Sequence, residues 1–509
     1  MSDPATVKFI KRALLSGAGA AMLFAGATVA HELAPRPATA QEIAIAPPSG
    51  APMSFADLIE RVSPAVVSIQ VRQRPDAARP GPNLEGLPPG FEEFFRRGPG
   101  SAPREAPTSL GSGFIIDQNG IVVTNHHVVA GAEEIIVRTS DGEERQADLV
   151  GSDQPTDIAV LRIRGGGRFR YVSFDDARDV RVGDWVVAVG NPFGLDGTAT
   201  AGIVSAMGRR NFIDSAYVDF IQIDAPINRG NSGGPTFDLR GRVIGVNSAI
   251  FSPTGGNVGI GFAIPAEVAS RIVTQLVDSG AVTRGWLGVQ VQAIDDDIAR
   301  SLGLQDAQGA LVGSVVPDSP AAAAGLQTGD LILTFEGQRL ADSRDLTRRV
   351  GDFPVGRNAR LEVLRNGERR QVSVRLRARP SDEQLLASAQ QPNQGPNVTA
   401  PPPAAEPAPA ALGLSVRPIT PEDRQRFELA ADAAGLVVLS VQPNSDLSRK
   451  GVRPGDVITR ADNRAIATPA DLAAAVDAAQ RAGRPVLLRL EGRGGARFIA
   501  AETGAVSRG

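Results

Sequence analysis

One short pattern occurs twice in the C-terminal half of the chain, and this duplication constrains the fold more than any other feature. The pattern consists of 315–319 (VVPDS) followed by 325–330 (GLQTGD). It recurs 126 residues later as 441–445 (VQPNS) followed by 451–456 (GVRPGD). An apolar-Gly-apolar element precedes each copy, at Leu287-Gly288-Val289 and at Leu412-Gly413-Leu414. A period this long predicts duplication of a whole small domain, because solenoid repeats recur every ~20–50 residues.

Composition separates the two copies from each other and from the rest of the chain. Residues 380–411 are rich in Pro, Ala, Gln and Asn, which is typical of a flexible to semi-extended linker. We therefore expect the first copy at 281–379 and the second at 412–505. A chain of 509 residues leaves room for a further domain, which we expect at 52–280.

Short runs of β-branched residues bounded by turn residues dominate the segment 52–280. The strand-length runs are 66–69, 113–116, 121–124, 134–137, 157–163, 185–189 and 243–250. Asp141-Gly142 is typical of a hairpin turn, and only 265–277 has helical spacing, with Gly280 beyond its end. Many short strands with so little helix predict antiparallel barrels or sandwiches. Residues 73–108 are dense in Pro, Gly and Arg, which predicts a long loop inside this region.

The first forty residues have the features of a secretory signal peptide. Basic residues between Lys8 and Arg12 precede an apolar run over 13–30, and Ala38-Thr39-Ala40 offers a small-residue cleavage site. Cleavage after Ala30 and retention of the segment as a membrane anchor are the alternatives. Each outcome places the remaining chain outside the cytoplasm, and only retention would associate it with a membrane.

Composition also restricts the chemistry. The chain has no Cys, which excludes disulfides, thiolate zinc sites and cysteine nucleophiles. Of its three histidines, His31 lies within the leader and is removed with it, so His126 and His127 are the imidazoles that remain. A net charge of −3 gives no reason to expect nucleic acid as a partner. We expect a reaction carried out by side chains alone, with no metal and no cofactor.

Three short segments hold the residues suited to that chemistry. In 224–235 (DAPINRGNSGGP), Ser232 is enclosed by glycines, and a serine is a nucleophile only when a neighbouring base takes its proton. The glycines let the amides of Gly230 and Ser232, with Asn231 as a further candidate, converge on a developing oxyanion. The alternative is a glycine-rich turn with an incidental serine.

The second segment, 122–129 (VVTNHHVV), supplies the base at the end of an apolar strand. Imidazole accepts and returns a proton near neutral pH, whereas the alternatives are a surface or packing histidine pair. We expect no zinc site, because adjacent side chains on a strand point to opposite faces and no HExxH motif is present. In the third segment, 152–161 (SDQPTDIAVL), Asp157 precedes an apolar run and would need a partner for its buried carboxylate. Its alternative is a capping role, and we expect its competitor Asp153 to be a solvated loop residue.

In the order His, Asp, Ser these segments follow the chymotrypsin-like proteases, and the chain resembles the HtrA/DegP family of bacterial periplasmic serine proteases. The resemblance extends from 55–69 (FADLIERVSPAVVSI) through 230–234 (GNSGG) to two PDZ-like repeats. It implies a mainly β fold: a chymotrypsin-like double β-barrel protease domain followed by two PDZ-like α/β domains. It assigns the catalytic roles to His127, Asp157 and Ser232. Relatives usually carry a non-histidine residue where this chain has His126, so the choice of His127 rests on the following Val-Val.

The resemblance also implies an ATP-independent serine endopeptidase that degrades unfolded or misfolded envelope proteins, assembled as a homotrimer or larger cage. The aromatic cluster 91–95 (FEEFF) falls where the family has a long regulatory loop and suggests a contact surface, and the alternative is a locally collapsed loop. The alternative function is a periplasmic chaperone or PDZ peptide-binding scaffold with little hydrolytic activity.

Two binding sites follow from the same comparison. Trypsin-like relatives carry an acidic residue six positions before the serine, where this chain has Pro226, so a basic P1 residue has no evident partner. We expect Ile227 with Ser248, Ala249 and Ile250 to line a small apolar pocket, and cleavage to follow Val, Ile or Ala. In the first repeat, the amides of Leu287-Gly288-Val289 are expected to hold the carboxylate of a C-terminal peptide, and the alternative is a strand that merely contains a glycine.

Overall fold

The computed structural model describes residues 54–73, 108–174, 179–191, 197–209, 215–228, 230–252, 256–381, 384–385, 412–430, 433–492 and 495–503. The expected signal peptide and the cluster 91–95 lie outside these ranges, as do nearly all of the expected loop 73–108 and linker 380–411. Within the described ranges, no helix has both the length and the apolar character needed to cross a bilayer.

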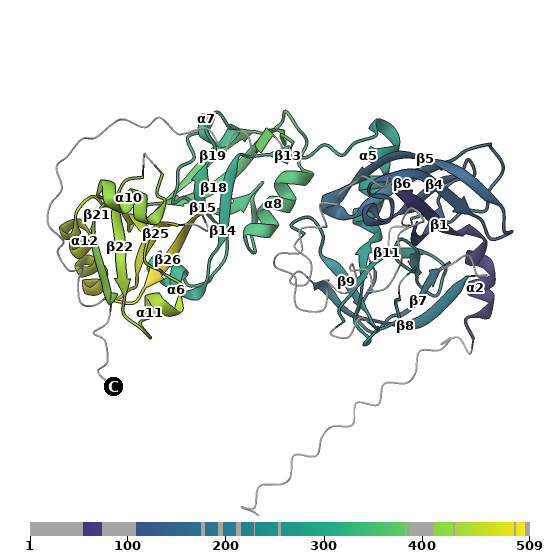
Figure 1. The fold of residues 1–509 in the computed structure, drawn as a ribbon, viewed down its shortest axis with the longest axis horizontal. Coiled ribbons are helices and arrows are strands. Elements are labelled where there is room, and N and C mark those ends of the chain that lie inside the picture. The colour runs from purple at the N-terminus through teal and green to yellow at the C-terminus, as the bar shows by residue number, and fades with distance from the viewer. Residues whose placement is uncertain are drawn as a thin grey trace, which may run out of the picture. The chain divides into compact units, whose positions relative to one another are not determined.

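The N-terminal part of the described chain forms a closed antiparallel barrel in the strand order β1-β2-β3-β6-β5-β4 (Figure 1). Its strands are β1 (Val66–Gln73), β2 (Thr108–Ile115), β3 (Ile121–Thr124), β4 (Ala132–Arg138), β5 (Glu144–Asp153) and β6 (Ile158–Ile163). Helix α2 (Ala56–Val62) and the 3-10 turn η1 (Ser63–Ala65) lead into β1. The hairpin predicted at Asp141-Gly142 joins β4 to β5 and is closed by the Thr139 amide on the Glu143 carbonyl at 3.0 Å.

A second closed barrel follows in the order β10-β11-β12-β9-β8-β7. Its strands are β7 (Trp185–Gly190), β8 (Thr198–Arg209), β9 (Phe220–Ile223), β10 (Pro235–Phe237), β11 (Val243–Ile250) and β12 (Gly261–Pro265). The predicted helix is α5 (Ala266–Ser279), and Gly280 ends it with a left-handed φ of 73°. Helix α5 contacts β6 of the first barrel and β11 of the second, so it joins the two barrels.

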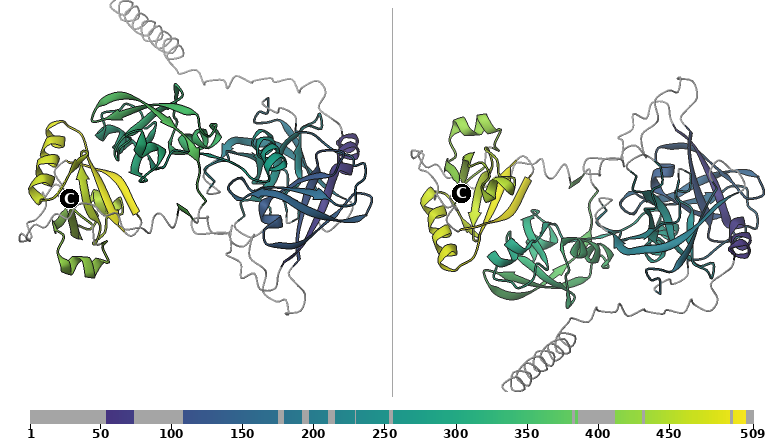
Figure 2. Two further views of the ribbon diagram at one scale, coloured as in Figure 1. Left: turned by 90° about the horizontal axis from the view of Figure 1, so that it is seen from above. Right: turned by 90° about the horizontal axis from the view of Figure 1, so that it is seen from below.

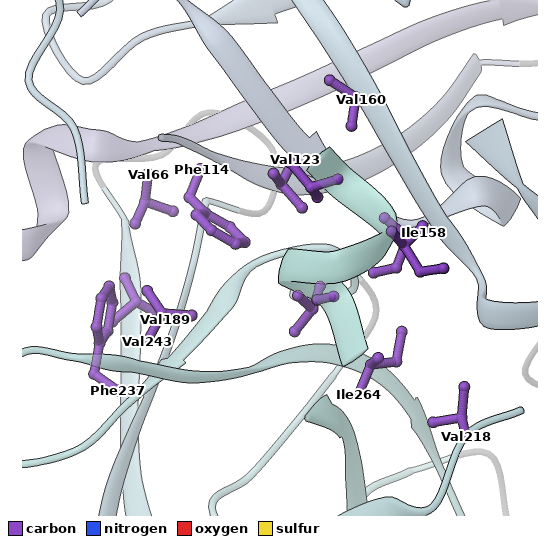
Figure 3. Packing of buried hydrophobic residues seen from close by; sticks show 14 of the residues in the cluster. Val66, Phe114, Val123, Ile158, Val160, Val189, Val218, Phe237, Val243 and Ile264 are labelled. Atoms are coloured by element: carbon purple, nitrogen blue, oxygen red, sulfur yellow. The ribbon is translucent and has the colours of Figure 1, made fainter. Parts of the chain in front are cut away.

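The two barrels share one apolar core. Phe114, Val123 and Ile158 of the first barrel belong to the same buried cluster as Val189 and Ile264 of the second (Figure 3). Burial of each such side chain contributes about 1.5–3 kcal/mol. Both views in Figure 2 show the purple-to-blue strands directly against the teal ones, so the barrels form one body with a seam between them.

The C-terminal half contains two sheets built on one plan, each with its first strand at an edge. The first copy comprises β13 (Gly285–Trp286), β14 (Val289–Ala293), α6 (Asp296–Ser301), β15 (Ala310–Val315), α7 (Pro320–Ala323), β16 (Leu331–Phe335), β17 (Gln338–Arg339), α8 (Ser343–Asp352), β18 (Asn358–Arg365), β19 (Glu368–Arg375) and β20 (Arg377–Ala378).

The second copy comprises β21 (Leu414–Pro418), α10 (Pro421–Phe427), β22 (Leu436–Val441), α11 (Asp446–Arg449), β23 (Val457–Ala461), β24 (Arg464–Ala465), α12 (Pro469–Arg481), β25 (Val486–Gly492) and β26 (Gly495–Ala501). The first strand of each sheet, β14 or β21, lies at one edge, and helices α8 and α12 contact these two strands. The duplication and the mainly β fold class predicted from the sequence are confirmed.

Candidate active site

His127 and Asp157 form a hydrogen-bonded pair at the seam between the barrels. Both carboxylate oxygens of Asp157 lie 2.9 Å from His127 Nδ1, and the main-chain amide of His127 donates to Oδ1 at 3.0 Å. From the second barrel, the Ser248 hydroxyl donates to Oδ2 at 2.8 Å. The carboxylate therefore meets donors from both barrels, and it selects the tautomer of His127 that carries its proton on Nδ1.

Local backbone geometry explains how Asp157 reaches this position. The 3-10 turn η2 (Gln154–Thr156) ends at Asp157, whose φ of 56° lies in the left-handed region. That conformation is uncommon for a non-glycine residue and is held here by tertiary bonds. The Asp157 carbonyl accepts from the His126 amide at 3.1 Å and from Asn125 Nδ2 at 2.9 Å.

The pKa values of the pair move apart. Burial alone would lower the pKa of His127, but the charge of Asp157 and the hydrogen bond to it raise that pKa above its ordinary 6.5. Burial would raise the pKa of Asp157, whereas His127 and the bonds from the His127 amide and Ser248 lower it below 3.8. The pair thus stabilises a carboxylate beside an imidazole that readily holds a proton.

The two histidines lie on a helical turn, and the expectation that they end a strand is wrong. Helix α4 spans His126–Val129, so neighbouring side chains are not directed to opposite faces as on a strand. His126 is turned away from the pair: its Nδ1 lies 3.1 Å from Ser152 Oγ. Burial lowers the pKa of His126; the charges of Asp157 and Asp153 oppose this shift, and that of His127 adds to it.

Ser232 lies on the loop between β9 and β10, pressed against the first barrel. Its carbonyl accepts from the Ser112 amide at 2.9 Å. The next residue, Gly233, has a φ of 84°, and a Cβ there would lie 2.3 Å from Thr124 Oγ1 and 3.1 Å from the Asn125 amide nitrogen. Only glycine fits this approach, which brings the serine loop against the residues that precede the histidines.

The described residues show no hydrogen bond between the Ser232 hydroxyl and His127. Such bonds are often long in unliganded enzymes and tighten when substrate binds.

The amides around Ser232 divide into those that are bonded and those that are not. The Asn231 amide donates to the Asn228 carbonyl at 3.0 Å, and the Gly233 amide donates to the Asn247 carbonyl at 2.8 Å. Neither the Gly230 nor the Ser232 amide has an acceptor among the described residues. The pair of amides expected from the sequence is therefore free to bind an oxyanion, whereas the amide of the further candidate, Asn231, is engaged elsewhere.

The four residues expected to line a pocket have separate roles in packing. Ile227 and Ile250 are buried in the core of the second barrel, and Ala249 belongs to the core shared by both barrels. Ser248 sits where the pairing of β11 with β12 shifts register, and this bulge directs its hydroxyl to Asp157. Sequence reasoning missed this bond because a bulge leaves no local signal. Beside Ile227, a Cβ on Gly261 would lie 3.1 Å from Ile227 Cγ1.

The expectation for Asp153 is wrong: the residue is buried, with only 5% of its surface exposed. Its carboxylate accepts from the Thr156 amide at 3.1 Å, which caps the turn before Asp157. Arg284 donates two bonds of 2.6 Å to the same carboxylate and stacks over the Tyr217 ring at 4.4 Å. The sequence could not reveal this partner, which lies 131 residues further along the chain.

In the first repeat, Leu287 and Gly288 lie just before the edge strand β14. The Leu287 carbonyl accepts from Ala321 at 2.8 Å and the Gly288 carbonyl from Val316 at 2.9 Å. Neither amide of Leu287 or Gly288 finds an acceptor among the described residues. Gly288 has a φ of 80°, and a Cβ there would lie 2.2 Å from Ser319 Cβ, so glycine is required. Val289 begins the edge strand itself.

Comparison with known proteins agrees with this arrangement. Residues 111–246 match the trypsin-like peptidase domain, and residues 285–376 and 410–497 match the PDZ domain. A probable periplasmic serine endoprotease DegP-like of Brucella melitensis is 43% identical over 496 residues, which cover 91% of this chain and 92% of that protein. The chain belongs to the DegP-like family of serine endoproteases. A DegP-like relative from Ectopseudomonas mendocina is 44% identical over 457 residues, covering 87% and 93% of the two chains.

Solved structures resemble about two thirds of this DegP-like chain. The HtrA-type protease AlgW with tripeptide is 39% identical, with a TM-score of 0.55, and the match covers 65% of this chain and 99% of that one. AlgW with decapeptide is 40% identical, with a TM-score of 0.54 and coverages of 64% and 99%. The protein is a serine endopeptidase with two PDZ domains.

Proposed function

We propose that this DegP-like enzyme degrades unfolded or misfolded envelope proteins without ATP, with Ser232 as nucleophile, His127 as general base and Asp157 as the carboxylate that orients the base. The bonding of Asp157 to both the Nδ1 and the main-chain amide of His127 carries this proposal. This bonding directs the other ring nitrogen, Nε2, away from the carboxylate, so that Nε2 can accept the proton of a serine hydroxyl.

The reaction follows from these contacts. His127 Nε2 takes the proton of Ser232 as its oxygen attacks the peptide carbonyl, and Asp157 stabilises the imidazolium that forms. The carbonyl oxygen becomes an oxyanion and accepts from the Gly230 and Ser232 amides, each worth about 3–4 kcal/mol in the transition state. The imidazolium then returns the proton to the leaving amine, and water hydrolyses the acyl-enzyme by the same route.

For the substrate, we propose cleavage after Val, Ile or Ala. Pro226 stands where trypsin-like relatives carry an acid, and the apolar side chain of Ile227 follows it, packed beside Gly261. Cut sites mapped by mass spectrometry on a denatured protein should show mostly small aliphatic residues at P1. A majority of Lys or Arg at P1 would contradict the proposed pocket.

The PDZ domains are proposed to bind C-terminal peptides at the edge strands, with the peptide carboxylate on the unbonded amides of Leu287 and Gly288 and on the amide of Val289. Homologues are named periplasmic, and this supports a periplasmic location reached through the signal peptide 1–40. The family also supports assembly as a homotrimer or larger cage, which light scattering of the purified protein would measure.

The deciding experiment replaces Ser232 by Ala. Casein hydrolysis should fall on the order of 10⁶-fold in turnover, and an unchanged rate would rule out the mechanism. Chaperone activity is favoured as a second function, because strands β14 and β21 each lie at a sheet edge and the amides of Leu287 and Gly288 beside β14 are unbonded within the described part of the chain. The S232A protein should then still bind labelled C-terminal peptides saturably and suppress aggregation of an unfolded client.

A further inference from the structure

Ser112 on β2 is a fully buried residue of the first barrel that contacts the nucleophile loop of the second. Its hydroxyl donates to the Gly230 carbonyl and accepts from the Asn191 amide at 2.8 Å. Its main-chain amide donates to the Ser232 carbonyl at 2.9 Å. One residue thus holds the carbonyls on both sides of Asn231 and uses its hydroxyl as donor and acceptor at once.

These bonds determine which amides of the loop remain free. Because the Gly230 and Ser232 carbonyls turn toward Ser112, the amides bonded to those carbonyl carbons, of Asn231 and Gly233, point the opposite way and reach Asn228 and Asn247. The amides of Gly230 and Ser232 are left without acceptors. The free pair is what an oxyanion requires, and Ser112 makes two of the bonds that leave it free.

The loop needs these hydrogen bonds from Ser112 because its glycine residues let the backbone rotate easily. Gly230 has a φ of 98° and Gly233 a φ of 84°, and glycine exchanges between left-handed and right-handed regions at little cost. Without the Ser112 hydroxyl, the buried Gly230 carbonyl and the Asn191 amide would both lose a hydrogen-bond partner, which is unfavourable for buried polar groups. Rotation of the 230–231 peptide toward another donor would relieve part of that cost and disturb the adjoining amides.

We propose that Ser112 is a positioning residue for the oxyanion-binding amides of Gly230 and Ser232, a role that rests on the proposed function of this loop. It acts through the Gly230 carbonyl and touches neither the substrate nor the reacting atoms. Those amides stabilise the transition state and contribute little to the binding of the peptide before it reacts.

The test uses the full-length chain with Ser112→Ala, and Ser68→Ala as its matched control. Ser68 lies directly opposite Ser112 in the β1–β2 register and is equally buried, and its hydroxyl has no hydrogen-bond partner in the part of the chain that the structure describes. Removal of one oxyanion donor costs about 10²–10³ in kcat. Displacement of the pair in S112A should lower kcat about 10–100-fold with KM nearly unchanged, and S68A should keep the parent kcat.

A second readout separates positioning from general damage to the fold. A peptide boronate forms a tetrahedral adduct on Ser232, so its inhibition constant should rise in S112A by the factor by which kcat falls. The affinity of an uncleaved peptide, measured with S232A alone and with S112A/S232A, should stay the same. If S112A does not fold, Ser112→Cys keeps the shape with a weak donor and should give a kcat between those of the parent and a tenfold loss.

Three results would overturn the proposal while S232A remains inactive: full kcat in S112A, full kcat in S112C where S112A does not fold, or an equal loss in S68A. Persistent hydrolysis by S232A would instead refute the proposed function.

Discussion

The buried ion pair between Arg284 and Asp153 should hold the turn that presents Asp157. Arg284→Met removes the guanidinium at similar length, and it leaves the Asp153 carboxylate buried with only its bonds to Thr156. The side chains of Arg284 and Asp153 are 11% and 6% exposed, so water cannot replace the lost partner. We therefore expect R284M to destabilise the end of β5 and the turn η2.

The size of the effect follows from burial. Removal of one partner of a buried ion pair costs about 3–5 kcal/mol, and ~1.4 kcal/mol is a factor of ten in an opening equilibrium. Amide protection over residues 153–158 should then fall by about 2 to 3.5 orders of magnitude. The double variant R284M/D153N removes the uncompensated charge and should regain part of that protection.

Hydrogen exchange followed by mass spectrometry on the full-length S232A chain would measure this local change without autolysis. Arg164 and Asp148 provide a matched control, because Asp148 is an aspartate of the same strand β5 and pairs with an arginine at 2.9 Å, but both side chains are more than half exposed. Arg164→Met should leave protection unchanged, since exposed pairs are screened by solvent. Equal protection in R284M and R164M would refute the reasoning from burial.

Further predictions concern the triad itself. The rate should fall as pH drops through the raised pKa of His127, because only neutral imidazole can take a proton. The acid limb of kcat/KM should therefore lie above pH 6.5. Asp157→Asn should abolish this upward displacement of the limb, and a limb below pH 6.5 in the parent enzyme would contradict the prediction. His127→Ala should lower kcat at least ~10³-fold, whereas His126→Asn should keep kcat within several-fold; the reverse order would reassign the base. Ser248→Ala should lower kcat about tenfold by removing one hydrogen bond to the carboxylate, which steady-state kinetics with an unchanged melting temperature would verify.

Features with a local signature could be predicted from the sequence. Strand-length β-branched runs predicted antiparallel barrels or sandwiches, and the structure has two barrels. The spacing over 265–277 with Gly280 predicted α5, because hydrophobic periodicity records which face of an element is buried. The repeated segments predicted two domains of one kind. The His-Asp-Ser order also predicted the contact between His127 and Asp157 that the structure places at the seam.

Contacts that join distant segments could not be predicted. Ser248 reaches Asp157 across 91 residues, and Arg284 reaches Asp153 across 131. Each depends on how two elements dock, and neither leaves a pattern in its own segment. The expectation for Asp153 fails for this reason: a turn with a proline normally faces solvent, and the burial of this carboxylate is compensated by Arg284, which lies directly before β13.

The seam between the barrels shows why apolar packing alone does not make the site. Burial of Phe114, Val123 and Ile264 supplies most of the attraction there, but that attraction has no direction and tolerates small sliding motions. Hydrogen bonds have direction, and the buried hydroxyls of Ser112 and Ser248 each cross the seam to a group next to the chemistry. Loss of either hydroxyl should therefore leave the barrels docked but the reacting groups misaligned, which is why kcat is expected to respond more strongly than thermal stability.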